Sequence, residues 1–259
     1  YQLIKYPVLE FLYLLPGLFL VAPLVILFKN PDVIHAHGLV AGFAGVFWGK
    51  LLGKRVVIST HSIYHFTPQG LYRSFVKWIF NNADIALGLS NQAVSEIKSL
   101  VPGQDVRKFT YWIDLDKFKV PAKGEARQRR QSSKLKVNKF LVLFVGRLVE
   151  EKGILELLQA AKIWNKDITL SIIGSGPLEG NIKYQILNTK NINFLGKVDN
   201  DKLPLYYSSA DVVIVPSIHE EGFGRVILES LSCGTPVVGS NRGAIPEAMN
   251  KTVGKIIEV

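Results

Sequence analysis

Short apolar runs rich in β-branched residues alternate with helical patterns along most of the chain. From residue 140 onward the runs predict strands at 140–145, 168–173, 192–195, 212–215, 236–239 and 253–257. The helical patterns fall at about 152–164, 178–188, 201–208, 225–233 and 244–249. Buried parallel strands read as continuous apolar runs, and their alternation with helices is typical of parallel α/β units. This half of the chain is therefore predicted to be a doubly wound parallel sheet.

The first part has the same organisation. Strands are predicted at 32–36, 54–59, 84–88 and 106–113, and helices at 39–51, 69–82 and 91–100. A doubly wound domain normally opens with a strand and a glycine-bearing turn, but this chain opens inside an apolar helix. We therefore expect a fragment of a longer protein, with a Rossmann-like domain at 1–118 that lacks its first strand and glycine-rich loop. A linker at 119–138 and a second Rossmann-like domain at 139–259 follow.

The segment 11–28 is an uncharged apolar run of 18 residues, long enough to suggest a transmembrane helix. Pro16, Gly17 and Pro23 interrupt it, and a predicted strand of the same domain follows almost at once. A buried or membrane-surface helix is therefore favoured over a spanning one.

The formal net charge is +10, and most of the excess is confined to one stretch. Residues 117–139 hold nine basic residues and one acidic residue, a net of +8 that leaves +2 for the remainder. Because no basic stripe follows the predicted folded segments, nucleic acid is not expected as a partner. Cys233 is the only cysteine, which excludes an intramolecular disulfide and fits a cytoplasmic protein.

The most informative stretch is VPSIHEEGFGRVILESLSCGTPVVG at 215–239. A predicted strand ends at its start, Glu221 lies on the following loop, and Glu229 lies one turn inside the next helix, so both carboxylates can face one crevice. Gly222 and Gly224 let backbone amides approach a ligand, and the helix N-terminus favours an anionic group. A carboxylate such as Glu229 suits paired hydroxyls, such as those of a ribose.

Two further motifs follow predicted strands at the same sheet edge. In LFVGRLVEEKG at 143–153, a strand ends in Gly146-Arg147 and the next helix begins near Lys152. Gly174 and Gly176 form a tight turn after the next strand. The carboxyl edge of an open parallel sheet is where ligands bind, and the two cations can neutralise a diphosphate leaving group.

Taken together, these segments resemble the retaining glycosyltransferases of family 4, which have the two-Rossmann GT-B fold. GRLVEEKGI, IIGSGP, FLGKV, ADVVIVPS and the spacing from Glu221 to Glu229 occur in the family's order. DVIHAHG at 32–38 and VVISTHS at 56–62 carry the resemblance in the first domain. The resemblance implies two Rossmann-like domains facing a cleft.

The resemblance also assigns residues to a nucleotide-sugar site. It implies Arg147 and Lys152 on the diphosphate, Glu229 on the ribose, and Glu221 near the sugar. The implied catalytic residues are His61, Glu221, Arg147 and Lys152. The implied nucleotide-sugar-binding residues are Gly146, Arg147, Lys152, Gly174, Gly176, Lys197, Val198, Glu221, Phe223, Gly224, Arg225, Val226 and Glu229.

Two further histidines of the first domain, His35 and His37, alternate along one predicted strand. His35 and His37 are expected to divide their roles, one as a core residue and the other approaching the cleft. One departure from the family lies ahead of Ile113-Asp114, where Tyr111-Trp112 replaces the usual Asn-Gly. Asp114-Leu115-Asp116 and Asp199-Asn200-Asp201 spell the Asp-x-Asp of metal-dependent transferases, but both are set aside because cations at 147 and 152 offer the same neutralisation.

The sequence thus predicts transfer of a hexose-type sugar from a UDP- or GDP-sugar to a glycan or lipid-linked acceptor, with retention of configuration. Neither a cofactor nor a metal is expected. Residues 11–28 and 117–139 suggest peripheral contact with the inner face of the cell membrane. Two alternatives remain, namely a nucleotide-sugar epimerase of the same fold and a non-catalytic nucleotide-sugar-binding protein or fragment.

Overall fold

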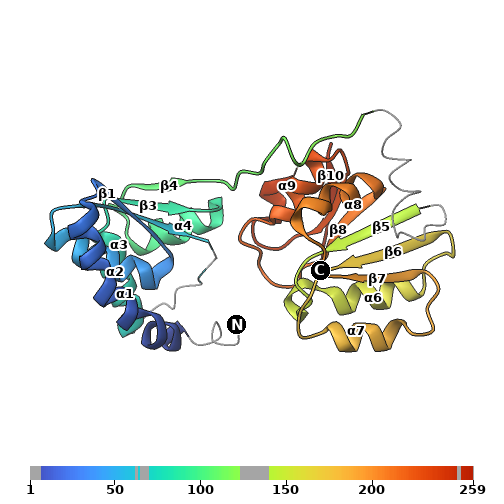
Figure 1. The fold of residues 1–259 in the computed structure, drawn as a ribbon, viewed down its shortest axis with the longest axis horizontal. Coiled ribbons are helices and arrows are strands. Elements are labelled where there is room, and N and C mark those ends of the chain that lie inside the picture. The colour runs from blue at the N-terminus through green and yellow to red at the C-terminus, as the bar shows by residue number, and fades with distance from the viewer. Residues whose placement is uncertain (1–6, 62–63, 65–69, 123–139, 250–251, 259) are drawn as a thin grey trace. The chain divides into compact units, whose positions relative to one another are not determined.

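The computed structural model describes residues 7–61, 64, 70–122, 140–249 and 252–258, and the chain forms two compact units (Figure 1). The first unit ends at Thr110 and the second begins at Tyr111. Residues 111–118, which the sequence places at the end of the first domain, thus belong to the second unit. Lys117 Nζ donates a hydrogen bond to Asn200 Oδ1 at 2.6 Å, which ties this segment to the second unit. Of the linker predicted at 119–138, residues 123–138 lie outside the described residues.

The first unit is a parallel four-stranded sheet with the strand order β1-β2-β3-β4. Its elements are α1 (Pro7–Lys29), β1 (Val33–His37), α2 (Gly38–Leu51), β2 (Arg55–Thr60), α3 (Leu71–Asn81), β3 (Ile85–Gly88), α4 (Asn91–Leu100) and β4 (Val106–Lys108). The predicted strand at 106–113 is wrong beyond Lys108. β4 is an edge strand, and the chain leaves the sheet there and enters the second unit at Tyr111.

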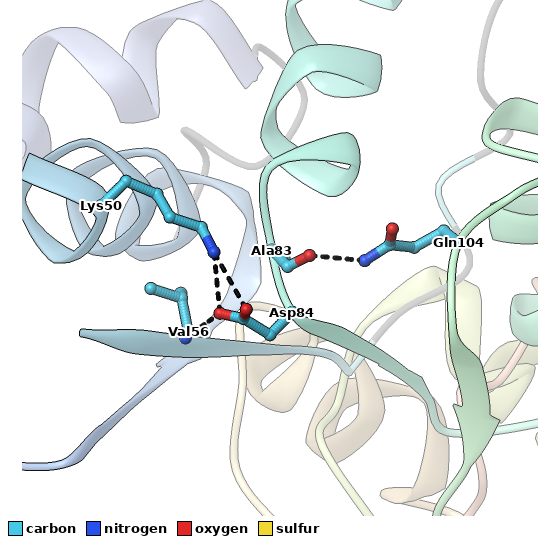
Figure 2. Close-up of polar contacts among 5 residues, drawn as sticks. All are labelled: Lys50, Val56, Ala83, Asp84 and Gln104. Atoms are coloured by element: carbon cyan, nitrogen blue, oxygen red, sulfur yellow. Dashed lines mark hydrogen bonds and ion pairs between the residues drawn. The ribbon is translucent and has the colours of Figure 1, made fainter. Parts of the chain in front are cut away.

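Asp84 joins the amino ends of two neighbouring strands of this sheet. Its carboxylate accepts hydrogen bonds from the Val56 amide at 2.6 Å and from Lys50 Nζ at 2.9 and 3.0 Å, as Figure 2 shows. The second unit has the same arrangement, because Asp211 Oδ2 accepts a hydrogen bond from the Leu141 amide at 2.6 Å. In each unit, an Ala-Asp pair before a strand thus satisfies a backbone donor at the start of its neighbour.

The helix α1 covers the predicted apolar segment 11–28 and packs on α2. Pro23 has no N–H, so it leaves the carbonyl of Phe19 without its helical partner. The indole Nε1 of Trp48 on α2 donates to that carbonyl at 2.9 Å, and the two rings lie 5.1 Å apart. The inward face of α1 is thereby fixed to the unit. No helix within the described residues has the length and apolar character that a bilayer crossing needs.

The second unit is a six-stranded parallel sheet with the order β10-β9-β8-β5-β6-β7. Its strands are β5 (Phe140–Val145), β6 (Ile168–Ile173), β7 (Ile192–Gly196), β8 (Val212–Val215), β9 (Val237–Ser240) and β10 (Gly254–Ile257). Its helices are η2 (Glu150–Lys152), α6 (Ile154–Lys162), α7 (Glu179–Ile186), η3 (Asn200–Lys202), α8 (Leu203–Ser209), α9 (Arg225–Ser232) and α10 (Ile245–Ala248). All six predicted strands and the doubly wound arrangement are confirmed.

The two faces of this sheet are covered by different helices. Val142 and Phe144 of β5 pack with α6 and α7 on one face, which can be followed in Figure 1. Leu143, between them, packs with α8, α9 and α10 on the other. Successive side chains of a strand point to opposite faces, so a sheet covered on both sides needs the continuous apolar run FLVLFV.

Candidate functional site

The predicted site residues of the second unit gather at the carboxyl edge of its sheet. The chain runs from β5 to β6 and β7 on one side, and then crosses to β8 on the other side of β5. The point between β5 and β8, where the strand order reverses, is where open α/β sheets bind ligands. The loop after β5 carries Arg147 and Lys152, and the loop after β8 carries Glu221.

These two loops are joined by an ion pair. Lys152 Nζ contacts Glu221 Oε1, and the Ser217 hydroxyl donates to the same carboxylate oxygen at 2.6 Å. The two charged side chains are 24% and 14% exposed. Ser217 is held in turn, because Ser240 Oγ donates to its carbonyl at 2.6 Å. Lys152 and Glu221, which belong to separate sequence motifs, therefore meet in one partly buried cluster. Arg147, on the loop after β5, is exposed.

Gly153 allows the two loops to approach. It has a left-handed φ of +66°, and a Cβ on it would lie 2.0 Å from the Pro216 carbonyl oxygen. The backbone amides of Ile218 and His219 donate to the Glu151 carbonyl at 3.1 and 3.3 Å. No side chain larger than hydrogen fits at Gly153, so its glycine is required by close backbone contact.

The glycines of the neighbouring turn are also sites of close backbone approach. A Cβ on Gly174 would lie 1.8 Å from the Gly146 carbonyl oxygen, and one on Gly176 would lie 2.5 Å from that of Leu148. The Leu148 amide donates to the Ser175 carbonyl at 3.0 Å. The structure therefore accounts for these glycines through the packing of the loops after β5 and β6. Their predicted contact with a nucleotide stays a prediction.

The loop after β8 delivers the chain to the start of α9. Gly224 precedes the helix with a φ of +73°, Phe223 is buried, and Arg225 is exposed at the first helical position. Tyr111, from the segment that enters the second unit, packs edge-on against Phe223 with ring centroids 6.2 Å apart. Val226 packs against the apolar core. The residues on either side of the first helical position are thus packed against the second unit, and Arg225 is exposed between them.

Glu229 is the most buried of the predicted site residues that carry a charge. It is 4% exposed, and its Oε2 accepts a hydrogen bond from the Tyr207 hydroxyl at 2.8 Å. Arg225 Nη2 lies 3.7 Å from Oε1. Burial raises the pKa of Glu229, while the hydrogen bond from Tyr207 and the charges of Arg225 and Lys117 oppose that rise. The carboxylate is held in one orientation.

The remaining predicted residues of this unit follow β7. Lys197 is exposed directly after the strand, and Val198 packs partly against the core. Gly196, at the end of β7, accepts a hydrogen bond at its carbonyl from the Gly174 amide at 2.9 Å. The ends of β6 and β7 therefore lie together, at the same edge as the loops after β5 and β8.

In the first unit, His61 follows β2 and joins a histidine cluster. Its Nε2 lies 2.8 Å from His37 Nδ1, and Ser59 Oγ lies 2.9 Å from His37 Nδ1 and 3.2 Å from His61 Nε2. The rings of His35 and His37 are 4.3 Å apart. Burial lowers the pKa of His61, and positive charge on His37 and His35 would lower it further. A neutral imidazole is favoured there.

The expected division of roles between His35 and His37 is wrong. Neither is a core residue, because both are exposed along β1 while Ala36 between them is buried. Residues two apart on a strand share a face, which the contact between the two rings reflects.

The two Asp-x-Asp sequences have structural partners. Asp114 Oδ1 accepts from the amides of Asp116 and Lys117 at 3.0 and 3.1 Å, which closes a turn. Asp201 pairs with Lys117, and Asp199 lies 3.3 Å from Lys202.

Sequence reasoning missed two residues that hold the predicted carboxylates. Tyr207 supports Glu229 from α8, and Ser217 supports Glu221 from the start of its own loop. Ser217 lies four residues before Glu221 in the quoted motif, so its position could have indicated a role. Tyr207 lies 22 residues from its partner, in a segment that reads as an ordinary amphipathic helix.

Comparison with known proteins gives the family. The profile of the family described as Glycosyl transferases group 1 matches residues 125–259, and that of Glycosyltransferase Family 4 matches residues 2–117. An uncharacterized glycosyltransferase of Methanocaldococcus jannaschii is 32% identical over 87% of this chain and 61% of its own length.

Solved structures have the same fold. Sucrose-phosphate synthase from Thermosynechococcus elongatus superposes with a TM-score of 0.79 at 25% identity, over 94% of this chain and 65% of that protein. Anabaena HepE, in complex with UDP and glucose, gives a TM-score of 0.74 at 24% identity, over 92% and 67%.

The two parallel α/β units therefore constitute a GT-B glycosyltransferase fold. The chain belongs to the glycosyl transferases group 1 family. It spans 61% of the length of the Methanocaldococcus jannaschii protein.

Proposed function

We propose that the protein transfers a hexose-type sugar from a nucleoside diphosphate sugar, of the UDP or GDP type, to a glycan or lipid-linked acceptor with retention of configuration. The observation that carries this proposal is the cluster at the switch point of the second sheet. There Lys152 and Glu221 form an ion pair between the loops after β5 and β8, and Arg147 is exposed on the first of these loops. Membership of a glycosyltransferase family supports the same conclusion.

Each group in the proposed site has a chemical task. Arg147 and Lys152 neutralise the diphosphate as the bond to the sugar breaks, which stabilises the leaving group without a metal. Glu229 accepts hydrogen bonds from the ribose hydroxyls, and backbone amides at Phe223, Gly224 and Arg225 surround the sugar together with Glu221. Lys197 and Val198 lie beside the base. In the first unit, His61 serves the sugar and the acceptor.

Lys152 is paired with Glu221 through its ammonium group. We expect it to shift toward the diphosphate when the donor binds. An incoming diphosphate competes for that ammonium group and releases the carboxylate toward the sugar hydroxyls. Binding of the diphosphate and ordering of the sugar would thereby be coupled through one side chain.

The test of the proposal is turnover after removal of one cation. Arg147→Ala should depress sugar transfer at least about 100-fold, because one charge-assisted contact to the leaving group is lost. Lys190→Ala is the matched control, since Lys190 lies in the turn before β7 rather than at the carboxyl edge. Near-normal turnover of Arg147→Ala would contradict the assignment. Product formed without an acceptor would indicate an epimerase instead.

We propose further that the first unit contacts an anionic membrane surface through the outward face of α1, as a peripheral protein of the cytoplasmic side. This face is apolar, with Leu20 72%, Leu27 63% and Phe28 85% exposed. Lys29 ends the helix, and Lys54 lies close to it through a 2.6 Å hydrogen bond to Asn30. Apolar area beside cations suits a surface that carries acidic lipids.

Vesicle flotation tests this contact. The chain should float with vesicles that contain acidic phospholipid, and Phe28→Ser combined with Leu27→Ser should reduce the bound fraction several-fold. The control is Leu187→Ser, which removes an equally exposed leucine from the second unit. Equal binding of all variants, or no binding of the unaltered chain, would contradict the proposal.

A further inference from the structure

Glu229 has a buried partner outside the motif that identifies it. Tyr207 on α8 is fully buried, and its hydroxyl donates to Glu229 Oε2 at 2.8 Å. Glu229 lies on α9, so the hydrogen bond joins two helices on the same face of the sheet. Among the hydrogen bonds of the described residues, Glu229 is the one residue of the proposed sugar-nucleotide site that a side chain of α8 contacts.

Tyr207 is itself fixed in position. Its backbone carbonyl accepts a hydrogen bond from Thr235 Oγ1 at 2.7 Å. The ring of Phe118, from the segment that enters the second unit, lies with its centroid 6.2 Å from that of Tyr207. These contacts hold the backbone and one side of the ring of Tyr207, and its hydroxyl donates to Glu229.

The surroundings of the pair contain three other titratable or charged groups. Arg225 approaches the second carboxylate oxygen to 3.7 Å, Lys117 acts on Glu229 from the entering segment, and Cys233 lies near Tyr207. Burial raises the pKa of Tyr207 well above its ordinary value, so its hydroxyl stays protonated and remains a donor. Burial also raises the pKa of Glu229, and the hydrogen bond from Tyr207 acts against this rise.

We propose that Tyr207 is a positioning residue for the ribose-binding carboxylate, which it holds in one orientation by occupying one acceptor site of Oε2. Each carboxylate oxygen has two acceptor sites, so Glu229 retains capacity for a pair of ribose hydroxyls. The inference rests on the proposed role of Glu229 in binding the ribose. It assigns no contact between Tyr207 and the ligand, because the tyrosine is fully buried.

The experiment compares two ligands that differ in the ribose. Binding of UDP, GDP and ADP to the unaltered chain is measured first, and the nucleotide that binds is then compared with its 2′,3′-dideoxy analogue. Tyr207→Phe should weaken ribonucleotide binding by up to about tenfold, because the ligand itself must then fix the orientation of the Glu229 side chain. It should change binding of the dideoxy analogue less than about twofold, because that ligand has no hydroxyls for Glu229.

A pH series gives a second readout. Without the Tyr207 hydroxyl, the pKa of Glu229 rises further, so ribonucleotide binding by Tyr207→Phe should be lost at a higher pH than in the unaltered chain. Glu229→Gln has no carboxylate to protonate, and this dependence should vanish in it. Tyr206→Phe, the same one-atom change one position earlier on α8, is the matched control and should behave as the unaltered chain.

The outcomes separate the inference from the proposed function. An equal loss for both ligands in Tyr207→Phe would show a general structural role and overturn the inference, while leaving nucleotide binding intact. An unchanged pH dependence in Glu229→Gln would overturn it even if Tyr207→Phe did not fold. A folded, unaltered chain that bound no nucleotide would contradict the proposed function itself, and the inference with it.

Discussion

The ion pair between Lys152 and Glu221 allows a quantitative test of the site. Glu221→Gln keeps the shape of the side chain but removes its charge, which leaves the Lys152 ammonium group only 24% exposed and without its carboxylate. Ser217 Oγ can still donate to the amide oxygen that replaces Oε1. The principal change is therefore electrostatic, and it should lower the free energy of unfolding.

The magnitude follows from the partial burial of the pair. Two unit charges about 4 Å apart attract by about 4 kcal/mol at an effective dielectric constant of about 20. Desolvation offsets much of this, and fully exposed pairs contribute only about 0–1 kcal/mol. With exposed fractions of 24% and 14%, we expect a coupling of about 1.5 kcal/mol. That corresponds to a shift in Tm of roughly 3–6 °C.

A double-mutant cycle isolates this coupling. Lys152→Met, Glu221→Gln and the double variant are compared with the unaltered chain by thermal unfolding without nucleotide. The control cycle uses Lys183 and Glu179, which form a pair at 2.7 Å with exposed fractions of 57% and 37%. The control coupling should be below about 0.5 kcal/mol. Equal couplings for the two pairs, or less than about 0.5 kcal/mol for the site pair, would refute the reasoning.

Three further predictions concern the packing and ionisation of both units. Gly153→Ala should lower the free energy of unfolding, measured in urea, by at least about 2 kcal/mol, because its Cβ would lie 2.0 Å from the Pro216 carbonyl oxygen. The control Gly103→Ala should be near neutral, because a Cβ there would have no atom within 4 Å. A backbone hydrogen bond lowers the pKa of Asp84, so its contribution to stability is present above the unfolded value of about 3.9 and is lost as pH falls through the folded pKa. Asp84→Asn should remove that acid sensitivity. Parallel curves of stability against pH for Asp84→Asn and the unaltered chain would contradict this prediction. Burial lowers the pKa of His61, so its contribution to the free energy of unfolding is complete above its unfolded pKa of 6.5 and is lost as pH falls through the folded pKa. His61→Gln should flatten the curve of stability against pH in that range.

The sequence predicted the second sheet well because its strands are covered on both faces. Runs such as FLVLFV at 140–145 and ITLSII at 168–173 have few alternatives to a buried parallel strand. The prediction of a strand over 106–113 was wrong beyond Lys108, where the strand lies at the edge of its sheet. At the sheet edge, apolar residues continue past Lys108. The Phe109 amide still donates to the Gly88 carbonyl of β3 at 3.0 Å, but the second unit begins two residues later, so composition alone does not mark the end of the strand.

The predicted site residues were recognisable where they lie at strand ends, since parallel topology brings those ends together. Their supports were harder to predict. The partner of Glu229 comes from another helix, and no local spacing rule connects Tyr207 with a residue 22 positions away. Gly174 and Gly176 were predicted as a tight turn with nucleotide-binding residues, and the structure shows close contacts between loops at both glycines and also at Gly153. Such contacts depend on tertiary packing, which a single sequence does not specify.

The most direct test of the central claim is a calorimetric titration of the chain with UDP, GDP and ADP, beside a Glu229→Ala variant of confirmed fold. The account predicts saturable binding of one nucleotide, weakened at least about tenfold by the substitution. A folded chain that binds none of the three nucleotides, or a variant that binds as tightly as the unaltered chain, would contradict the site at the carboxyl edge of the second sheet.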